Sequence, residues 1–392
     1  MALPSGFGPG ALLQLLLDGQ ARTRSELAEL TGLARSTVAA RVDLLLESRL
    51  ICAAGAATST GGRPPTRIAF NPLAGVIVAF DLGATHASVA LTDLTPRVLT
   101  IRHLPLSIAD GPRAVLDCCV ATAKEMLAMP GPWTSAPLTG AGIGVPGPVE
   151  HTTGRPVNPP IMPGWNRFDI PAYIQQSFPV PVLVDNDVNV LALGEHTARW
   201  ADTRDLLFVK VATGIGAGII AGGILQRGTT GSAGDLGHAL VPYGRDSPRA
   251  IPDERDLEAI ASGTAIATEL RGLGLDAPDS AAVVELVLAG DPHAIRATRQ
   301  AGREIGEVLA TVVNMLNPAA IVIGGSIARA GEHLLAGVRE VVYRRSIPLA
   351  TQHLAIVQSQ ADDAAGALGA ALMVTQRVLS EEAVDARFHP QE

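Results

Sequence analysis

The sequence predicts an α/β protein of two unequal parts, a small N-terminal helical domain and a large domain built on buried strands. One change of pattern along the chain and the length of the chain predict this division. Short helices with clear start and stop signals fill residues 1–72, whereas from residue 73 onward helices alternate with apolar strands that end in glycine-rich or polar turns. A chain of 392 residues is also too long for one compact core, so at least two folded units are expected.

The N-terminal domain begins with a pattern of three helices. A leucine-rich stretch predicts a first helix over residues 9–19, and the capping-box sequence at 23–26 starts a second one. Gly32 ends the second helix, because glycine tolerates the positive φ that a short turn requires. With Ala28 at the helix crossing and Val38 on the following helix, the spacing is typical of a helix-turn-helix.

The third helix, from about residue 35 to 49, is the predicted recognition helix of this domain. Its N-terminal end would enter the major groove of DNA, and the strands that follow would form a wing. The wing tip Gly61-Gly62-Arg63-Pro64-Pro65 is extended and basic, which suits a minor groove. A three-helix protein-interaction module is the alternative. We expect residues 1–72 to form a winged helix-turn-helix with these DNA-binding residues: Arg35, Ser36, Thr37, Arg41 and Arg63.

The charge distribution agrees with a DNA-binding module on an acidic body. The net charge of the chain is -8, yet residues 1–72 carry seven arginines against five acidic residues. The three cysteines, Cys52, Cys118 and Cys119, form no CxxC pair, and the apolar run 11–17 is too short to span a bilayer. We therefore expect a cytoplasmic protein without a membrane partner.

The large domain opens with a strand–turn–strand unit. Residues 76–80 are a buried-type strand, the turn Asp81-Leu82-Gly83-Ala84-Thr85 follows, and residues 87–92 form a second strand. Backbone N–H groups at such a turn can face phosphate oxygens, and the aspartate can hold Mg²⁺ directly or through water. Residues 207–219 repeat the pattern, which predicts an internal duplication of one lobe by another.

Two further segments carry turn or polar residues at the end of a strand. Residues 142–149 run from a strand into a Gly/Pro turn. Residues 182–189 are predicted as a strand with four polar side chains at its end, followed by a helix over 190–198. Polar groups at the ends of strands are typical of ligand sites in α/β proteins.

The motifs of residues 1–380 together resemble the ROK family (repressors, open reading frames and kinases), in its regulator branch with an N-terminal winged helix. They occur in the family's order, at 81–85, 144–147, 186–189, 214–218, 233–238 and 317–325. The resemblance implies an actin/hexokinase-like, two-lobed α/β domain over residues 73–392. Lobe I would comprise about 73–187 and 362–380, and lobe II about 188–361. A sugar would bind in the cleft between the lobes, beside ATP where ATP is used.

Asp187 is the central candidate of this cleft, since a carboxylate at a strand end can act as the general base that accepts a proton from a sugar hydroxyl. The resemblance implies a set of residues that bind the sugar hydroxyls: Asn186, Asp187, Asp235, His238 and Glu258. It implies nucleotide contacts, if a nucleotide binds, at Asp81, Gly83, Thr85, Thr213, Gly214, Gly216, Gly324 and Gly325. Plainer alternatives are a helix N-cap for Asp187, a satisfied buried histidine for His238 and a strand-to-helix turn for Gly324-Gly325.

The chain departs from the ROK pattern at the zinc site that the family usually carries. An alignment on the family's glutamate puts Arg249, Ile251 and Asp256 where three cysteines are expected. Without thiolates, His238 cannot complete a tetrahedral Zn²⁺ site. We therefore expect no structural zinc and no required cofactor.

Two smaller departures concern the ligands. Ala84 stands where a second glycine is common and would crowd a nucleotide, and Ile161 replaces an asparagine of many sugar kinases.

The resemblance implies a DNA-binding transcriptional regulator of carbohydrate metabolism, interpreted as a repressor, that senses a sugar or sugar phosphate. Since Asp187 is intact, an ATP-dependent hexose kinase that also binds DNA is the alternative, with Mg-ATP as cofactor. A ligand-independent DNA-binding or scaffolding protein is a third hypothesis.

The expected partners follow from the size of the DNA-binding domain. One winged helix buries too little surface for tight specific binding, so we expect a homodimer or homotetramer on pseudo-palindromic operator DNA. Closure of the cleft on a ligand would then move the winged helices through the connection near Asn71-Pro72.

Overall fold

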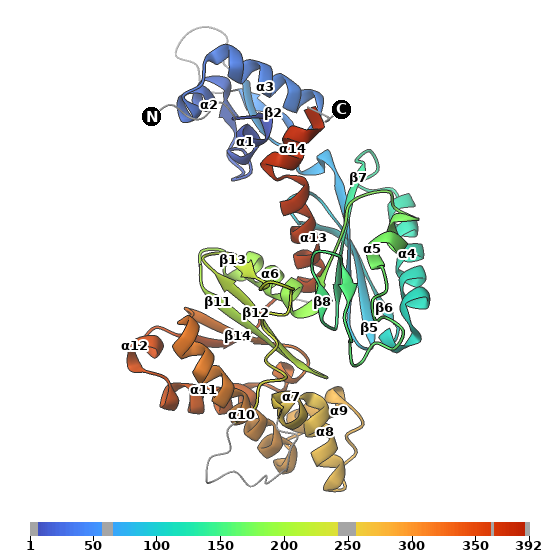
Figure 1. Ribbon diagram of the computed structural model, residues 1–392, viewed down its shortest axis with the longest axis vertical. Coiled ribbons are helices and arrows are strands. Elements are labelled where there is room, and N and C mark those ends of the chain that lie inside the picture. The colour runs from blue at the N-terminus through green and yellow to red at the C-terminus, as the bar shows by residue number, and fades with distance from the viewer. Residues whose placement is uncertain (1–6, 57–65, 242–255, 362–363, 389–392) are drawn as a thin grey trace.

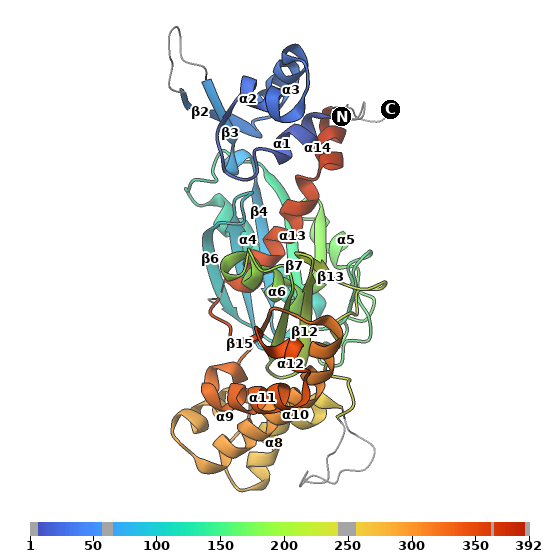
Figure 2. The same ribbon diagram turned by 90° about the vertical axis from the view of Figure 1, so that its left-hand side faces the viewer.

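The computed structural model describes residues 7–56, 66–241, 256–361 and 364–388. Figure 1 shows an elongated molecule with the N-terminal domain at one end and the two lobes of the large domain below it. The last two helices return from the lobes to the N-terminal domain, and Figure 2 shows the same arrangement from the side.

The N-terminal domain contains three helices and a three-stranded antiparallel sheet, in the order expected of a winged helix. The sheet has the order β1-β3-β2, and β2 and β3 form the hairpin that follows the third helix. Leu12, Leu27 and Val38, one from each helix, are fully buried in its core. The elements are α1 (Pro9–Gln14), β1 (Arg22–Thr23), α2 (Arg24–Thr31), α3 (Arg35–Glu47), β2 (Ile51–Ala56) and β3 (Thr66–Phe70).

Two local signals in the sequence fix the start and the end of α2. Thr23 and Glu26 form the predicted capping box, with distances of 3.2 Å from Glu26 N to Thr23 Oγ1 and 2.6 Å from Thr23 N to Glu26 Oε2. Gly32 ends the helix with a φ of 68°, as predicted. Helix α1 is shorter than predicted, because turns replace α-helical hydrogen bonding after Gln14.

Lobe I is built on a five-stranded mixed sheet of order β10-β7-β4-β5-β6. Strand β4 is buried on both faces, since Val78 and Phe80 pack toward α4 while Ile77 and Ala79 pack toward α13. The elements are η1 (Pro72–Ala74), β4 (Val76–Leu82), β5 (His86–Thr92), β6 (Val98–Pro105), η2 (Ile108–Asp110), α4 (Pro112–Ala128), β7 (Leu138–Val145), β8 (Val149–Glu150), β9 (Arg155–Pro156), α5 (Ile170–Gln175) and β10 (Val182–Asn186).

Lobe II repeats this design with the order β13-β12-β11-β14-β15. In both lobes three antiparallel strands are followed by two parallel ones, which confirms the predicted duplication. The elements are β11 (Leu206–Val211), β12 (Ile215–Ala221), β13 (Ile224–Gln226), α7 (Leu257–Ala261), α8 (Gly263–Gly272), α9 (Ser280–Leu288), α10 (Pro292–Leu316), β14 (Ala320–Gly324), η3 (Ile327–Ala330), α11 (Glu332–Arg345), α12 (Pro348–Thr351) and β15 (Ala355–Gln358).

Two helices cross tightly between the sheets, α6 (Asp187–Arg199) and α13 (Ala365–Val378). A Cβ added to Gly194 would lie 2.0 Å from the Ala365 carbonyl oxygen, and one added to Gly369 would lie 1.7 Å from that of Val190. Glycine is therefore required on both helices. Helix α6 begins at Asp187, three residues before the predicted start, so the strand to residue 189 predicted from the sequence is too long.

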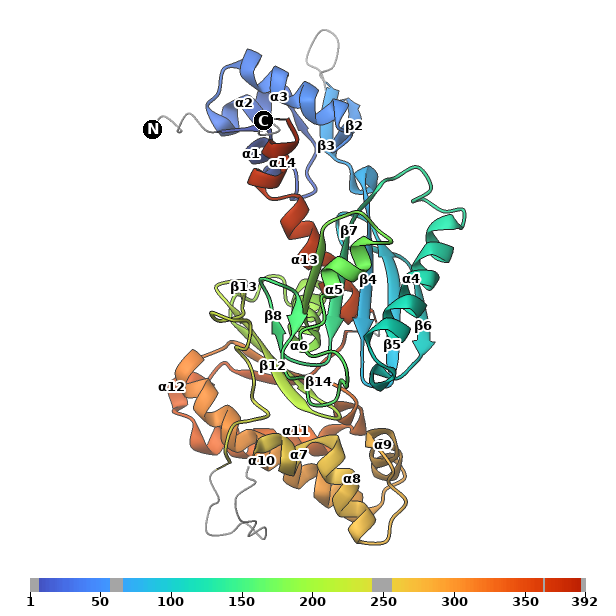
Figure 3. The same cartoon turned by 45° about the vertical axis from the view of Figure 1, so that its right-hand side comes forward.

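The last helix, α14 (Glu381–Phe388), packs against α1 and not against the lobes (Figure 3). Gly10 N donates to Asp385 Oδ1 at 2.7 Å, and Gln14 Nε2 donates to the Leu379 carbonyl at 2.7 Å. The predicted boundary at residue 72 does not anticipate this contact, since it connects segments more than 360 residues apart. Among the helices in the described ranges, none has the length and apolar character needed to cross a membrane.

Candidate functional site

A cavity of about 690 Å³ lies between the two lobes. Its walls are the turn after β4, the start of α6, the β11–β12 hairpin, the loop that leads to α7 and the turn after β14. Every residue predicted for sugar or nucleotide binding lines this cavity: Asp81, Gly83, Thr85, Asn186, Asp187, Thr213, Gly214, Gly216, Asp235, His238, Glu258, Gly324 and Gly325. The structure therefore brings together motifs that lie up to about 240 residues apart.

Asp187, the predicted base, is joined to Lys210 in the cavity. Lys210 Nζ donates a hydrogen bond to Asp187 Oδ2, and the side chains are 22% and 8% exposed respectively. On β11, Lys210 pairs with Gly216 of β12 and Gly324 of β14. Burial lowers the pKa of Lys210, but the Asp187 and Asp81 carboxylates outweigh this effect and hold it above its ordinary value.

Lys210 was not among the residues predicted for the site. A signal for it exists in the sequence, since Lys210 interrupts the apolar strand Leu206–Val211 and the chain has only one other lysine, Lys124. A lysine in a strand buried on both faces needs a partner, because an unpaired ammonium group is costly to bury.

Asp81 lies at the end of β4, against the N-terminus of α13. A Cβ added to Gly366 of α13 would lie 2.1 Å from Asp81 Oδ2, so the helix approaches the carboxylate closely. Burial and the charge of Asp187 raise the pKa of Asp81 to about 6, and Lys210 acts in the opposite direction. Asp81 is thus a poorly solvated carboxylate beside a second one.

Asn186, and not Asp187, is the N-cap of α6. Asn186 Oδ1 accepts a hydrogen bond from Val188 N at 3.0 Å, while its Nδ2 donates to the Gly147 carbonyl at 2.8 Å. Both ends of this amide are therefore occupied by the backbone. The alternative that Asp187 serves only as a cap is wrong, and its carboxylate points instead at Lys210.

Asp235 and His238 lie on the same loop and face the cavity together. His238 Nδ1 lies 2.8 Å from Asp235 Oδ1, and the side chains are 65% and 47% exposed. The hydrogen bond and the charge of Asp235 raise the pKa of His238. A buried-histidine role for His238 is therefore wrong. Glu258 has a structural contact, since its Oε2 accepts a hydrogen bond from Ile215 N at 2.8 Å.

Two of the glycines predicted for nucleotide binding lie where a side chain would meet neighbouring atoms. A Cβ on Gly214 would lie 2.5 Å from Glu258 Oε2, and one on Gly325 would lie 2.4 Å from the Val211 carbonyl oxygen. Gly325 also has a φ of 90°, which disfavours other residues. Their presence is thus explained by the turns themselves, and their nucleotide role stays a prediction.

The residues present do not fit a structural zinc ion. Among the described residues, no group of three or more His, Cys, Asp or Glu side chains is placed to hold a metal ion. Arg249 and Ile251 lie outside the described residues. The cysteines occur in β2 and α4, and none lines the cavity. The donor set is therefore not one that zinc prefers.

Of the predicted DNA-binding residues, Arg35, Ser36 and Thr37 lie in the first turn of α3 and Arg41 lies near its middle. Arg35 and Ser36 are exposed, whereas Thr37 and Arg41 are half-buried. Arg41 borders the buried face, because it follows Val38 by three residues and so lies near it on the helix surface. The N-cap is Ala34, without a side-chain hydrogen bond, so neither hydroxyl is used as a cap. The predicted wing-tip residue Arg63 lies outside the described residues.

Comparisons with known proteins agree with this architecture. A model described as the ROK family matches residues 77–377. The xylose repressor of Caldicellulosiruptor bescii is 28% identical over 387 residues, covering 94% of this chain and 95% of the repressor. The crystal structure of a ROK family transcriptional regulator, a homolog of the E. coli MLC protein, matches with a TM-score of 0.79 at 23% identity and covers 96% of this chain and 97% of its own. The ROK hexokinase from Thermus thermophilus, with a TM-score of 0.64 and 29% identity, covers 77% of this chain and 99% of its own.

Proposed function

This chain belongs to the ROK family, and we propose that it is a DNA-binding transcriptional regulator of carbohydrate metabolism that acts as a repressor. Its N-terminal domain would bind operator DNA, and its large domain would sense a sugar or sugar phosphate. The observation that carries the proposal is the extent of the likeness. A xylose repressor aligns with 94% of this chain, whereas a hexokinase of the family accounts for only 77% of it.

The surface of the N-terminal domain supports contact with DNA. Helix α3 presents Arg35 and Ser36 to solvent at its first turn, and no acidic residue lies in that turn. Hydroxyl and guanidinium groups are the side chains that most often contact phosphates and base edges. The hairpin β2–β3 follows α3 directly, where a wing would lie beside the recognition helix.

The contact between Lys210 and Asp187 favours a sensor over an enzyme. A general base needs a free lone pair directed at the proton that it accepts. In this cavity the Lys210 ammonium group occupies one of the two oxygens of Asp187, so only the other oxygen is left for a ligand. We assign Asp187 mainly as an acceptor of a hydrogen bond from a sugar hydroxyl, and its second oxygen would be the base in the kinase alternative.

The polar groups of the cavity define the class of ligand. The groups that face it include the carboxylates of Asp187, Asp235 and Glu258 and the imidazole of His238. Such groups accept and donate hydrogen bonds to several hydroxyls at once, and a ligand without matching hydroxyls would leave them unpaired. A polyhydroxylated ligand such as a sugar meets this requirement.

Two connections could carry a change in the cleft to the DNA-binding domain. One is the chain link at Asn71-Pro72, where Asn71 Nδ2 donates to the Arg49 carbonyl at 2.9 Å. The other is α13–α14, which begins beside Asp81 in the cavity and ends against α1. A ligand that favours a closed cleft would shift both connections together, provided that it binds the closed state more tightly.

The protein would act on DNA as a homodimer or homotetramer. A single recognition helix contacts too few base pairs for tight specific binding, so two copies of the domain are needed on a pseudo-palindrome. The large domain offers the surface for this assembly.

The proposal is tested with a DNA duplex that the wild-type protein selects from a random library. D-xylose, D-glucose, N-acetyl-D-glucosamine and their phosphates are screened for thermal stabilisation, with and without Mg-ATP. One of them is expected to stabilise the protein and to change its affinity for the selected duplex. Enzymatic phosphorylation of that sugar, abolished by Asp187→Asn, would replace the sensor with the bifunctional kinase. No selected duplex, or DNA binding that no sugar affects, would reject the regulator function.

A further inference from the structure

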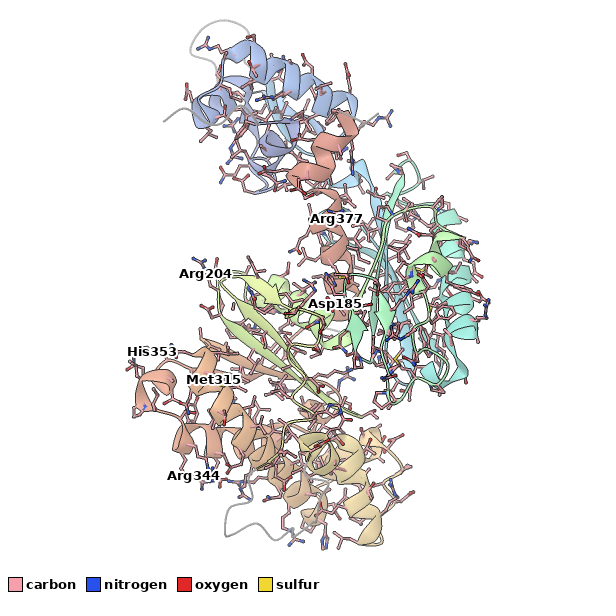
Figure 4. The ribbon with its side chains drawn as sticks, in the orientation of Figure 1. Asp185, Arg204, Met315, Arg344, His353 and Arg377 are labelled. Carbon is pink, nitrogen blue, oxygen red and sulfur yellow. The ribbon has the colours of Figure 1, made fainter. Side chains whose placement is uncertain are left out.

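A buried ion pair joins the edge strands of the two lobes. Asp185 lies on β10, at the edge of the lobe I sheet, and Arg227 directly follows β13, at the edge of the lobe II sheet. Arg227 Nε donates to Asp185 Oδ2 at 2.6 Å, and the side chains are 21% and 1% exposed. Figure 4 labels Asp185 in the region where the two lobes meet.

The other oxygen of Asp185 is also fully used. Asp185 Oδ1 accepts hydrogen bonds from Asn186 N and from Asn189 Nδ2, each at 2.8 Å. Three donors therefore fix this carboxylate at the start of α6, one residue from the cavity wall. Such a buried charge has one ionic partner, and loss of that partner would leave it uncompensated.

His151 is the titratable neighbour of this pair. His151 Nδ1 lies 3.8 Å from Asp185 Oδ2. This nitrogen of His151 is buried and has no hydrogen-bond partner among the described residues. Burial, followed by the charge of Arg227, lowers the pKa of His151. A neutral His151 leaves Arg227 as the cation that compensates Asp185.

Residues 227–238, here called the strap, begin at Arg227 and contact both lobes. Gly231 has a φ of 98°, and a Cβ added to it would lie 2.5 Å from the Val149 carbonyl oxygen of lobe I. Gly234 has a φ of 96°, and its carbonyl accepts a hydrogen bond from Ala217 N of lobe II at 2.8 Å. The strap thus lies across the cleft and has no room for side chains at its two contact points.

The strap also carries two of the predicted sugar ligands, Asp235 and His238, which line the cavity. Their own contact is the hydrogen bond between them, and both are largely exposed. The backbone beside them is tied to lobe II, since Ala217 N donates to the Gly234 carbonyl at 2.8 Å and Glu258 N donates to the Gly237 carbonyl at 2.9 Å. The ion pair with Asp185 ties the first residue of the strap to lobe I.

We propose that Arg227 is a positioning residue for the effector site: by binding Asp185 it holds the strap across the cleft and presents Asp235 and His238 to the ligand. The role of Asp235 and His238 as effector ligands rests on the proposed function, whereas the positioning of the strap by Arg227 does not. A pair kept only for stability would be easy to replace, because apolar substitutes for buried ion pairs are often neutral. Here the pair instead fixes the position of a loop of lobe II relative to strand β10 of lobe I.

The test uses two variants of Arg227 that differ in one property. Arg227→Gln places an N–H donor at the same distance from the backbone as Nε, whereas Arg227→Met has a similar length and no donor. Hydrogen–deuterium exchange of the full chain is followed without sugar. Arg227→Met is expected to raise exchange in 228–238 by roughly tenfold or more, while Arg227→Gln, which keeps the donor but loses the charge, raises it less. Arg204→Met, at an exposed arginine of lobe II, is the matched control and should leave exchange in 228–238 unchanged.

Asp185→Asn provides the reciprocal variant, and it decides the question if Arg227→Met does not fold. It should raise exchange in the same strap residues. Normal strap exchange in a folded Arg227→Met or Asp185→Asn protein, or an equal increase over all of lobe II, would overturn the proposal.

Affinity for D-xylose, D-glucose and N-acetyl-D-glucosamine gives a second readout. A sugar that binds wild type should bind Arg227→Met at least about tenfold more weakly, with Arg227→Gln between Arg227→Met and wild type. If wild type binds none of these sugars, the effector part of the proposed function fails, while the exchange experiment still decides the role of Arg227.

Discussion

Lys210 changes what Asp187 can do, because its ammonium group is bonded to the carboxylate that sequence reasoning assigns as the base. The same ammonium group also lowers the cost of burying Asp81 nearby. Three charged groups thus share one poorly solvated corner of the cavity, and removing any one of them changes the other two. Predictions at the scale of the residue concern this cluster and the zinc position.

Lys210→Met should destabilise the folded protein by about 3 kcal/mol, because it leaves the Asp187 carboxylate buried without its cation. The double variant Lys210→Met with Asp187→Asn should recover most of this loss, since no uncompensated charge then remains at that position. Urea unfolding of the two single variants and the double variant measures the coupling. Lys124→Met, at an exposed lysine of α4, is the control and should be close to neutral. Additive effects of the two substitutions would contradict the pairing.

Asp81→Asn should make stability less dependent on pH. The pKa of Asp81 is raised from 3.8 to about 6 in the folded protein. Its stabilising contribution is therefore complete below the unfolded pKa and is lost as the pH rises through about 6. Asp81→Asn avoids the buried charge, so its Tm should exceed that of wild type by roughly 2–4 °C at about pH 8 and match it near pH 4. A Tm difference that stays constant over this range would show that Asp81 does not titrate as described.

Zinc should be absent in stoichiometric amount from the purified protein, because the positions of the three family cysteines hold Arg249, Ile251 and Asp256. Incubation with a chelator should leave the Tm unchanged. Elemental analysis of the dialysed protein measures the metal directly. One zinc per chain, removable with loss of stability, would require ligands other than those of the family pattern.

At the scale of the element, different helices carry the different candidate functional regions of the molecule. Helix α3 presents polar residues for DNA, α6 carries Asp187 into the cavity, and α13 crosses α6 at Gly194 and Gly369 before the chain continues to α14. The crossing of α6 and α13 is close because both helices have glycine there, so their backbones are in contact. Packed elements of this kind shift as rigid bodies, which suits the transmission of a change from the cleft.

Arg41→Ala should weaken binding to a selected duplex by roughly 1–3 kcal/mol and relax its sequence preference, since Arg41 is predicted to read a base. Fluorescence anisotropy with the selected duplex and with single-base variants measures both effects. Arg344→Ala, at an exposed arginine of α11 in lobe II (Figure 4), is the control and should leave DNA binding unchanged. Arg41 would be excluded from the recognition surface if the variant bound every duplex as wild type does.

At the scale of the whole molecule, the far end of lobe II carries an exposed apolar patch. It is formed where α10 ends and α12 begins, and Ile347 N donates to Asn314 Oδ1 at 3.1 Å to join the two. Figure 4 labels Met315 in this region. The exposed apolar residues of the patch are Met315, Leu316, Tyr343, Ile347 and Leu349. Contiguous patches of this kind mark association surfaces, and a symmetric dimer would bury the same patch twice.

Leu349→Asp should convert an oligomer into a monomer, because it places a charge in the patch at a residue that is 72% exposed. Sedimentation velocity at micromolar protein measures the change. Leu288→Asp, at a leucine that is 69% exposed outside the patch, is the matched control and should leave assembly intact. A monomeric wild type, or a Leu349→Asp variant that still assembles, would remove this patch as the interface.

The sequence by itself determined those features that depend on neighbours along the chain. The capping box at Thr23 and Glu26 and the positive φ of Gly32 are local, so residue pattern alone predicts them. The ordered motifs predicted the two lobes and the residues that line the cavity, since the fold brings strand ends to one place regardless of loop length.

Only the tertiary structure decided which side chains are free to act. Asn186 took the helix cap, Lys210 took an oxygen of Asp187, and Arg227 reached Asp185 from the other lobe. Each of these contacts depends on atoms that come within hydrogen-bond distance of each other in the folded protein. The spacing of residues along the chain does not predict such distances between segments of different lobes. The contact of α14 with α1 was not predicted from the sequence for the same reason. Packing in the folded protein brings the two ends of the chain together, although they are far apart in the sequence.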